Sequence, residues 1–128
     1  MKLGIIGTAG RGPDGDRLKV ADWNMMCFVA MGLAHGLRAD CLVSGGAAFA
    51  DHVAVRLYQQ SACMKLSLHL PADFDENGFV ATDAQYDTGR TSNYYHLLFS
   101  QKISIDSLGD LKHVLKCGAK KTIGSDFK

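Results

Sequence analysis

The sequence predicts an α/β protein in which a mostly parallel β-sheet lies between layers of helices, as a three-layer sandwich. Short apolar runs alternate with longer segments of helical periodicity through the first 70 residues. Glycine-rich turns follow the first two apolar runs. The chain has 128 residues, of which 47% are hydrophobic and 21% charged, as is ordinary for one soluble domain.

Three strands and two helices are expected in the first half of the chain. The strands are Lys2–Gly7, Asp40–Ser44 and Met64–Leu70, and the helices are Arg17–Leu37 and Ala47–Ala62. Apolar side chains recur in both helices at three- and four-residue steps, which is the spacing of one helical face. Right-handed strand–helix–strand crossovers then give a Rossmann-like fold.

The second half of the chain is less regular. Residues 72–90 are polar and are expected to be mostly loop, followed by helices at Thr91–Ser100 and Ser107–Lys116. A fourth strand is expected near Lys102–Ile105 or near Lys121–Ile123, unless the sequence is the front part of a longer domain. We therefore expect one Rossmann-like domain, complete or shortened at its C-terminal end. Its open sheet edges favour a homodimer or a higher homo-oligomer.

Charge, cysteines and targeting signals exclude several classes of protein. Fourteen Lys and Arg against 13 Asp and Glu give a net charge of +1, so nucleic acid is an unfavourable partner. The four cysteines form no CxxC pair and are expected to be reduced. The chain shows no signal peptide and no apolar stretch of about 20 residues, which favours a cytoplasmic protein without a membrane partner. No metal-ligand spacing is present, so neither a metal nor a cofactor is expected.

The first glycine-rich turn follows the first strand and reads Gly7-Thr8-Ala9-Gly10-Arg11. Its backbone N–H groups can point toward an anion, and Thr8 adds a hydroxyl group. Arg11 adds a planar guanidinium group that suits phosphate or carboxylate. The spacing matches neither GxGxxG nor a P-loop, so a plain strand-to-helix turn is the alternative interpretation.

The second glycine-rich turn opens the second expected helix and reads Ser44-Gly45-Gly46-Ala47-Ala48. Unpaired N–H groups and a partial positive charge make a helix N-terminus favourable for phosphate. Asp51 follows early in the same helix, where it can contact a ribose hydroxyl or act as an acid or base; the alternative is an aspartate favoured by the helix dipole alone. Both turns lie at carboxyl ends of parallel strands, where ligands bind in such sheets.

Two further groups of side chains have both functional and structural interpretations. The segment Asn93-Tyr94-Tyr95-His96 can stack a base or supply acid–base chemistry, or it can be an aromatic stripe that packs a helix. His52 points about 100° away from its neighbour Asp51 around a helix and is expected at the surface.

The residues of the two turns resemble the SLOG superfamily. The resemblance rests on Gly7 to Arg11 and on the segment from Leu42 to Ala54. This group includes the DNA-processing protein A fold, lysine-decarboxylase-like phosphoribohydrolases that activate cytokinins, and molybdenum-cofactor carriers. The resemblance implies a Rossmann-like fold that binds a nucleotide or a related phosphorylated ligand. The segment from Asn93 to Ser100 resembles small phage and bacterial members of unassigned role.

The sequence also departs from the patterns of this superfamily. Its second turn commonly reads Ser-Gly-Gly-Ala-x-Gly-x-Asp, and Phe49 stands here in place of the third glycine. The phosphoribohydrolases instead show Pro-Gly-Gly-x-Gly-Thr-x-x-Glu. This chain has Ser44 for the proline, no Gly-Thr pair, and Asp51 one position short of the glutamate.

The leading hypothesis is a sensor, carrier or sequestering protein that binds a nucleotide or nucleotide-derived ligand between the two turns. Phosphate would contact Thr8, Arg11 and the backbone of 45–47, while Asp51 with Asn93 or Tyr94 would contact ribose or base. The alternative is a nucleoside-phosphate N-glycosidase or phosphoribohydrolase. There Asp51 would be catalytic, stabilising an oxocarbenium-like centre or activating water, and Arg11 would orient the phosphate. A DNA-binding module and an assembly protein are further alternatives.

Overall fold

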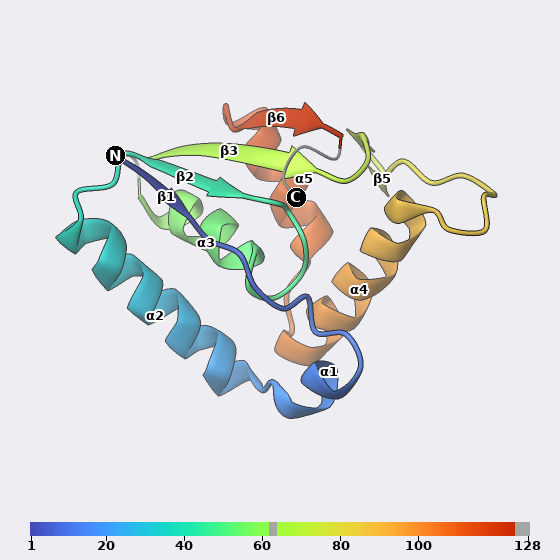
Figure 1. Ribbon diagram of the computed structural model, residues 1–128, viewed down its shortest axis with the longest axis horizontal. Coiled ribbons are helices and arrows are strands. Elements are labelled where there is room, and N and C mark those ends of the chain that lie inside the picture. The colour runs from blue at the N-terminus through green and yellow to red at the C-terminus, as the bar shows by residue number, and fades with distance from the viewer. Residues whose placement is uncertain (62–63, 125–128) are drawn as a thin grey trace.

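A computed structural model describes residues 1–61 and 64–124 of the chain (Figure 1). In chain order its elements are β1 (Lys2–Gly4), α1 (Pro13–Arg17), α2 (Val20–Gly36), β2 (Cys41–Ser44), α3 (His52–Gln60), β3 (Lys65–Leu70), β4 (Phe74–Asp75), β5 (Gly78–Phe79), α4 (Thr88–Ile103), α5 (Ser107–Lys116) and β6 (Lys120–Ile123). Strands and helices thus alternate through β3, which confirms the α/β class predicted from the sequence.

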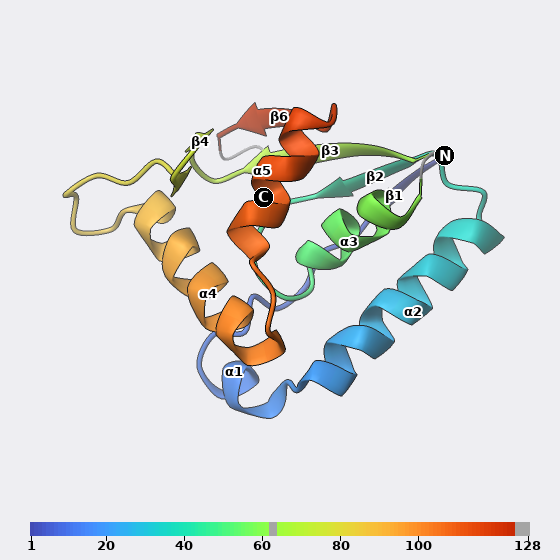
Figure 2. The same ribbon diagram turned by 180° about the vertical axis from the view of Figure 1, so that it is seen from behind.

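The main sheet has four strands in the order β1-β2-β3-β6, and every neighbouring pair is parallel. The strand order follows the chain order without a reversal. Because right-handed crossovers between strands in that order return on the same side, α2, α3 and α5 lie along one face of the sheet (Figures 1 and 2). The expected third layer is therefore not present in residues 1–61 and 64–124, which form one sheet and one helical layer.

The side chains of β3 alternate in agreement with a sheet covered on one face. Leu66, Leu68 and Leu70 are buried toward the helices, whereas Lys65 is exposed and Ser67 is partly exposed on the other side. Parallel strands buried on both faces instead show continuous apolar runs. The sequence of β3 thus matches an uncovered second face that water can solvate.

A cluster of aromatic side chains joins α2 to the connection between β2 and α3. Trp23 is 1% exposed, and its indole N–H donates a hydrogen bond of 2.9 Å to the carbonyl of Phe49. The ring of Phe99 from α4 lies 5.4 Å from that of Trp23 and 4.5 Å from that of Phe49, between centroids. The core therefore extends from α2 through this connection to α4.

Several element bounds differ from those predicted. The first strand ends at Gly4. The helix expected over Arg17–Leu37 is α2, which begins at Val20 and ends at Gly36, and an additional short helix, α1, precedes it. The helix expected from Ala47 begins only at His52, because Gly46 (φ 74°) and Phe49 (φ 56°) have left-handed backbone conformations that a right-handed helix does not contain. The expected end of that helix at Ala62 lies outside the described residues.

The second half of the chain contains more regular structure than predicted. The polar segment 72–90 includes the antiparallel pair β4 and β5, and α4 starts within it. Of the two places proposed for a fourth strand, 120–123 is correct, since 102–105 includes the end of α4. No helix of the described part of the chain has the length and apolar character needed to cross a membrane.

Phe49 provides a test of the backbone geometry. Replacing Phe49 with Ala should reduce the free energy of unfolding by about 3–5 kcal/mol, because a buried aromatic ring is lost. Replacing it with Gly should be less damaging than Ala by about 1 kcal/mol, because only glycine adopts positive φ without cost. Urea unfolding of both variants measures the difference.

Phe99 is the matched control, because it is equally buried but lies inside a helix. There Gly should be worse than Ala by about 1 kcal/mol. If the Gly variant were less stable than the Ala variant at position 49 as well as at position 99, a strained backbone at Phe49 would be contradicted.

Candidate functional site

A cavity of about 570 Å³ opens at the carboxyl ends of the central strands. This volume is in the range of small-molecule sites. Arg11 comes from the first glycine-rich turn, Gly45 and Ala47 from the second, and His69 from the end of β3. The remaining wall is the loop before α4 and the first turns of α4, which contribute Gln85, Tyr86, Thr88, Thr91 and Ser92, together with Pro71 and Gly124.

In the first turn, Arg11 faces the cavity while Thr8 organises the loop. The hydroxyl of Thr8 donates to the carboxylate of Asp14 at 2.6 Å and accepts the N–H of Gly10 at 3.1 Å. The guanidinium of Arg11 lies 4.8 Å from the centroid of the Tyr95 ring, a cation–π distance. The structure thus leaves Arg11 as the charged group of this turn at the cavity.

In the second turn, the polar groups are largely satisfied by the chain itself. The N–H of Ala47 lies 3.4 Å from a carboxylate oxygen of Asp51, and the N–H of Gly46 lies 3.4 Å from the Ser44 hydroxyl. That hydroxyl donates to the carbonyl of Asp51 at 2.9 Å. Two of the amides predicted to hold phosphate therefore have internal partners.

Asp51 is 7% exposed and is not among the residues that line the cavity. Burial raises the pKa of its carboxyl group, and the backbone N–H groups of Ala47, Gly7 and Gly45 act in the opposite direction. The N–H of Ala50 also donates to the carbonyl of Thr8 at 3.1 Å. Asp51 thus lies where the two turns meet, and its carboxylate accepts hydrogen bonds from backbone N–H groups of both turns.

His96 fixes the backbone of the second turn by a hydrogen bond to Gly46. Its Nε2–H donates to the carbonyl of Gly46 at 2.8 Å, and its Nδ1 accepts from the Ser107 hydroxyl at 2.8 Å. The donation to a carbonyl fixes this tautomer, because a carbonyl oxygen only accepts. Burial, with a smaller contribution from neighbouring His52, lowers the pKa of His96 to about 4. The residue is therefore a neutral structural group at neutral pH.

The structure separates the other members of the predicted aromatic patch from the cavity. The amide of Asn93 accepts from the N–H of Phe79 and donates to its carbonyl, both at 2.9 Å, and so holds β5 against α4. Tyr94 is 54% exposed and lines a separate cavity of about 540 Å³ with Gly10 and Lys102. The predicted ribose or base contacts from Asn93 and Tyr94 are thus not at the cavity that Arg11 lines.

The start of α4 is the part of the site that sequence reasoning missed. Asp87 caps the helix, accepting the N–H of Arg90 at 2.7 Å. The guanidinium of Arg90 in turn donates to the carbonyls of Thr82 and Ala84 at 2.9 and 2.7 Å, which fixes the loop that carries Tyr86. Asp87 itself was the available signal in this polar segment, because aspartate is favoured at the residue before a helix.

His52 is buried, so its predicted surface position is wrong. Its ring is fully buried, and its Nε2 lies 3.0 Å from a carboxylate oxygen of Asp110 in α5. Its Nδ1 has no hydrogen-bond partner among the described residues. The prediction failed because α3 packs against β2, α2 and α5 at once, which buries most of its circumference.

The chain is similar in sequence to a viral protein. No family model matches the chain, and no solved structure matches it. A similar protein is the uncharacterized protein R261 of Acanthamoeba polyphaga mimivirus, 29% identical over 117 residues. The aligned part covers 87% of this chain and 62% of the viral protein, so the chain spans less than two thirds of its relative.

The buried His96 predicts a loss of stability in weak acid. The unfolded chain binds a proton at this residue below its ordinary pKa of 6.5, whereas the folded protein binds it only near pH 4. The free energy of unfolding should therefore be insensitive to this residue above pH 6.5 and fall by about 3 kcal/mol as pH drops to 4. Urea unfolding across that pH range measures the change.

A His96→Gln variant should lose the part of this dependence that His96 causes, about 3 kcal/mol, since its amide can still donate to Gly46 without titrating. The neighbouring His52, whose pKa burial also lowers, keeps its own contribution in the variant. The exposed His35 is the control, and His35→Gln should leave the pH dependence unchanged. An identical dependence in His96→Gln would show that other groups cause it.

Proposed function

We propose that this protein is a Rossmann-like domain that binds a small phosphorylated ligand of the nucleotide class in the cavity lined by Arg11. The single observation that carries the proposal is the position of that cavity. It lies at the carboxyl ends of parallel strands and brings Arg11, Gly45 and Ala47 from the two glycine-rich turns to one wall. Open α/β sheets bind ligands at this edge.

Arg11 is the anchor for phosphate in this proposal. Its guanidinium is held by the Tyr95 ring and presents a planar set of N–H donors to the cavity. Thr91 and Ser92, in the first turns of α4, also line the cavity and carry hydroxyl groups. The second turn contributes no charged side chain to this proposal. Its Gly45 and Ala47 are small, so a ligand can approach the backbone closely there.

The other end of the ligand has an aromatic partner. Tyr86 lines the cavity and is 87% exposed, so its ring is free to stack on a base without losing core packing. Base–aromatic stacking contributes about 1–3 kcal/mol per base in proteins that bind single nucleic-acid strands. A phosphate at Arg11 and a base at Tyr86 suit a mononucleotide or a related ligand.

The raised pKa of Asp51 favours a second candidate, a nucleotide N-glycosidase. Burial raises the pKa of the Asp51 carboxyl group, and a carboxyl group with a raised pKa is a candidate general acid. The geometry does not supply the contact such an enzyme needs, because Asp51 is turned into the backbone of the turns. Release of free base from a nucleotide, abolished in Asp51→Asn with binding retained, would identify the enzyme.

Arg11 gives the decisive binding test. A thermal-shift screen with mononucleotides, cyclic nucleotides, NAD and ADP-ribose should raise the melting temperature by several degrees for phosphorylated compounds and not for nucleosides. For the best ligand, Arg11→Gln should raise the dissociation constant by about 10- to 100-fold, because one charged hydrogen-bonding contact is lost. Titration calorimetry measures the constant.

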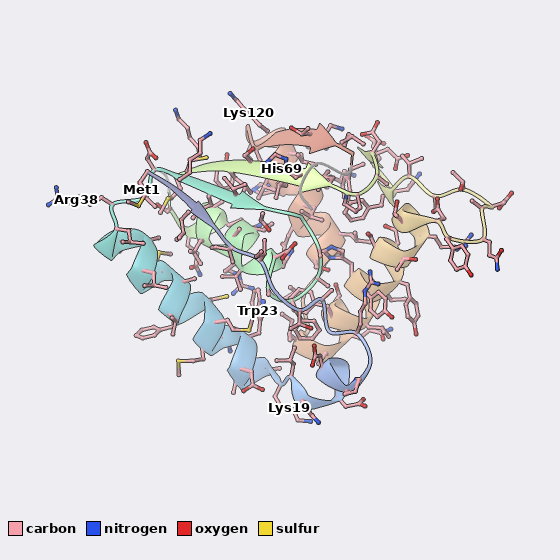
Figure 3. All side chains as sticks on the ribbon, in the orientation of Figure 1. Met1, Lys19, Trp23, Arg38, His69 and Lys120 are labelled. Atoms are coloured by element: carbon pink, nitrogen blue, oxygen red, sulfur yellow. The ribbon has the colours of Figure 1, made fainter. Side chains whose placement is uncertain are left out.

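Arg38→Gln is the matched control, since Arg38 lies at the far end of α2 (Figure 3). It should bind as tightly as the parent protein. Equal weakening in both variants would show a nonspecific charge effect, and no shift for any phosphorylated compound would rule out the proposed role.

A further inference from the structure

The outer face of α2 is apolar and exposed. Phe28 is 77% exposed, Met25 59%, Leu33 54% and Val29 50%. Phe28 and Val29 lie three and four residues after Met25, and Leu33 lies four residues after Val29, so the four residues share one face of the helix. Single exposed apolar residues are common on protein surfaces, but a continuous apolar patch marks an interaction site.

The rest of α2 is mostly apolar, and Asn24 and His35 are the polar side chains that follow Trp23. Trp23 and Ala34 are buried on the inner side, and the helix has no Lys, Arg, Asp or Glu from Trp23 to its end at Gly36. In Figure 3 Trp23 points into the molecule, while Lys19 and Arg38 lie at the two ends of the helix. A helix that is hydrophobic all around is normally buried on all sides.

A groove continues this face onto the edge of the sheet. It has a volume of about 430 Å³ and lies between the helix, with Met26 and Val29, and the first strand region, with Leu3, Ile5 and Ile6. Among residues 1–61 and 64–124, β1 pairs only with β2, so its other side is an unpaired edge within that part of the chain. The exposed helix face and the free strand edge thus lie side by side.

We propose that a second copy of this chain occupies the outer face of α2 and the adjoining groove, forming a two-fold symmetric dimer. The exposed parts of the four α2 residues with Ile6, which is 65% exposed, amount to several hundred Å², on the order of the ~800 Å² that each partner contributes to a standard interface. Two-fold pairing places this apolar face against itself without opposing like charges.

Two glycines on the same face allow the close approach that this pairing needs. Gly32 and Gly36 lie four residues apart on α2, and a Cβ atom added at either would meet nothing within 4 Å. A glycine inside a helix costs about 1 kcal/mol relative to alanine. A close contact between two copies of the helix would offset that cost.

Other occupants fit this face less well. The parts of the chain outside the described residues, 62–63 and 125–128, are too short to cover a helix of 17 residues. β6 also lies at the opposite edge of the sheet from β1. Helices that lie on membranes carry Lys and Arg along their polar face, and α2 has none between Trp23 and Gly36.

Phe28→Glu tests the proposal by analytical ultracentrifugation of the 128-residue chain. The parent should sediment as a dimer of twice 13.8 kDa. Phe28→Glu should weaken the dimer at least about 100-fold, because symmetry places both substituted residues in the interface. Its far-UV circular dichroism should be unchanged, since Phe28 is largely exposed in the monomer.

Leu97→Glu is the matched control, because Leu97 is 52% exposed on α4, away from this face. It should remain a dimer. A monomeric parent, a dimeric Phe28→Glu variant or dissociation by Leu97→Glu would each overturn the proposal. So would a monomeric parent that cosediments with vesicles of anionic phospholipid, which would assign the face to a membrane.

Discussion

The hydrogen bond from the Trp23 indole to the Phe49 carbonyl is the contact on which the rest of the structure depends. It closes α2 onto the connection between β2 and α3, a segment held in a left-handed conformation at Phe49. The ring of Phe49 then covers Gly10 in the first turn, where any side chain would collide with it. Both glycine-rich turns and α2 are thus positioned by one buried residue.

The sequence was sufficient for the parallel strands and for the place where the two glycine-rich turns gather, because both follow from local apolar runs and glycines. It was not sufficient for the number of layers. The alternation of Lys65, Ser67 and His69 with three leucines in β3 was a signal for one uncovered face, but the topology decides it. Strand order depends on long-range pairing, which local patterns do not encode.

Within the site, residue types were predicted better than their roles. Thr8 and Asp51 lie at the two turns as expected, yet their polar atoms bind the chain itself. His96 and Asn93 fix a turn and a strand by hydrogen bonds to backbone carbonyls. Such roles depend on partners up to 50 residues away, which spacing within a motif cannot reveal.

The bare face of the sheet and the outer face of α2 differ in how well water solvates their side chains. The bare face of the sheet carries Lys65 and Ser67, whose polar groups are solvated without a covering layer. The outer face of α2 carries Phe28 and Met25 with no polar group to solvate. Each Å² of apolar surface costs about 25 cal/mol when it stays in water. Covering the outer face of α2 would therefore stabilise this fold more than covering the bare face of the sheet.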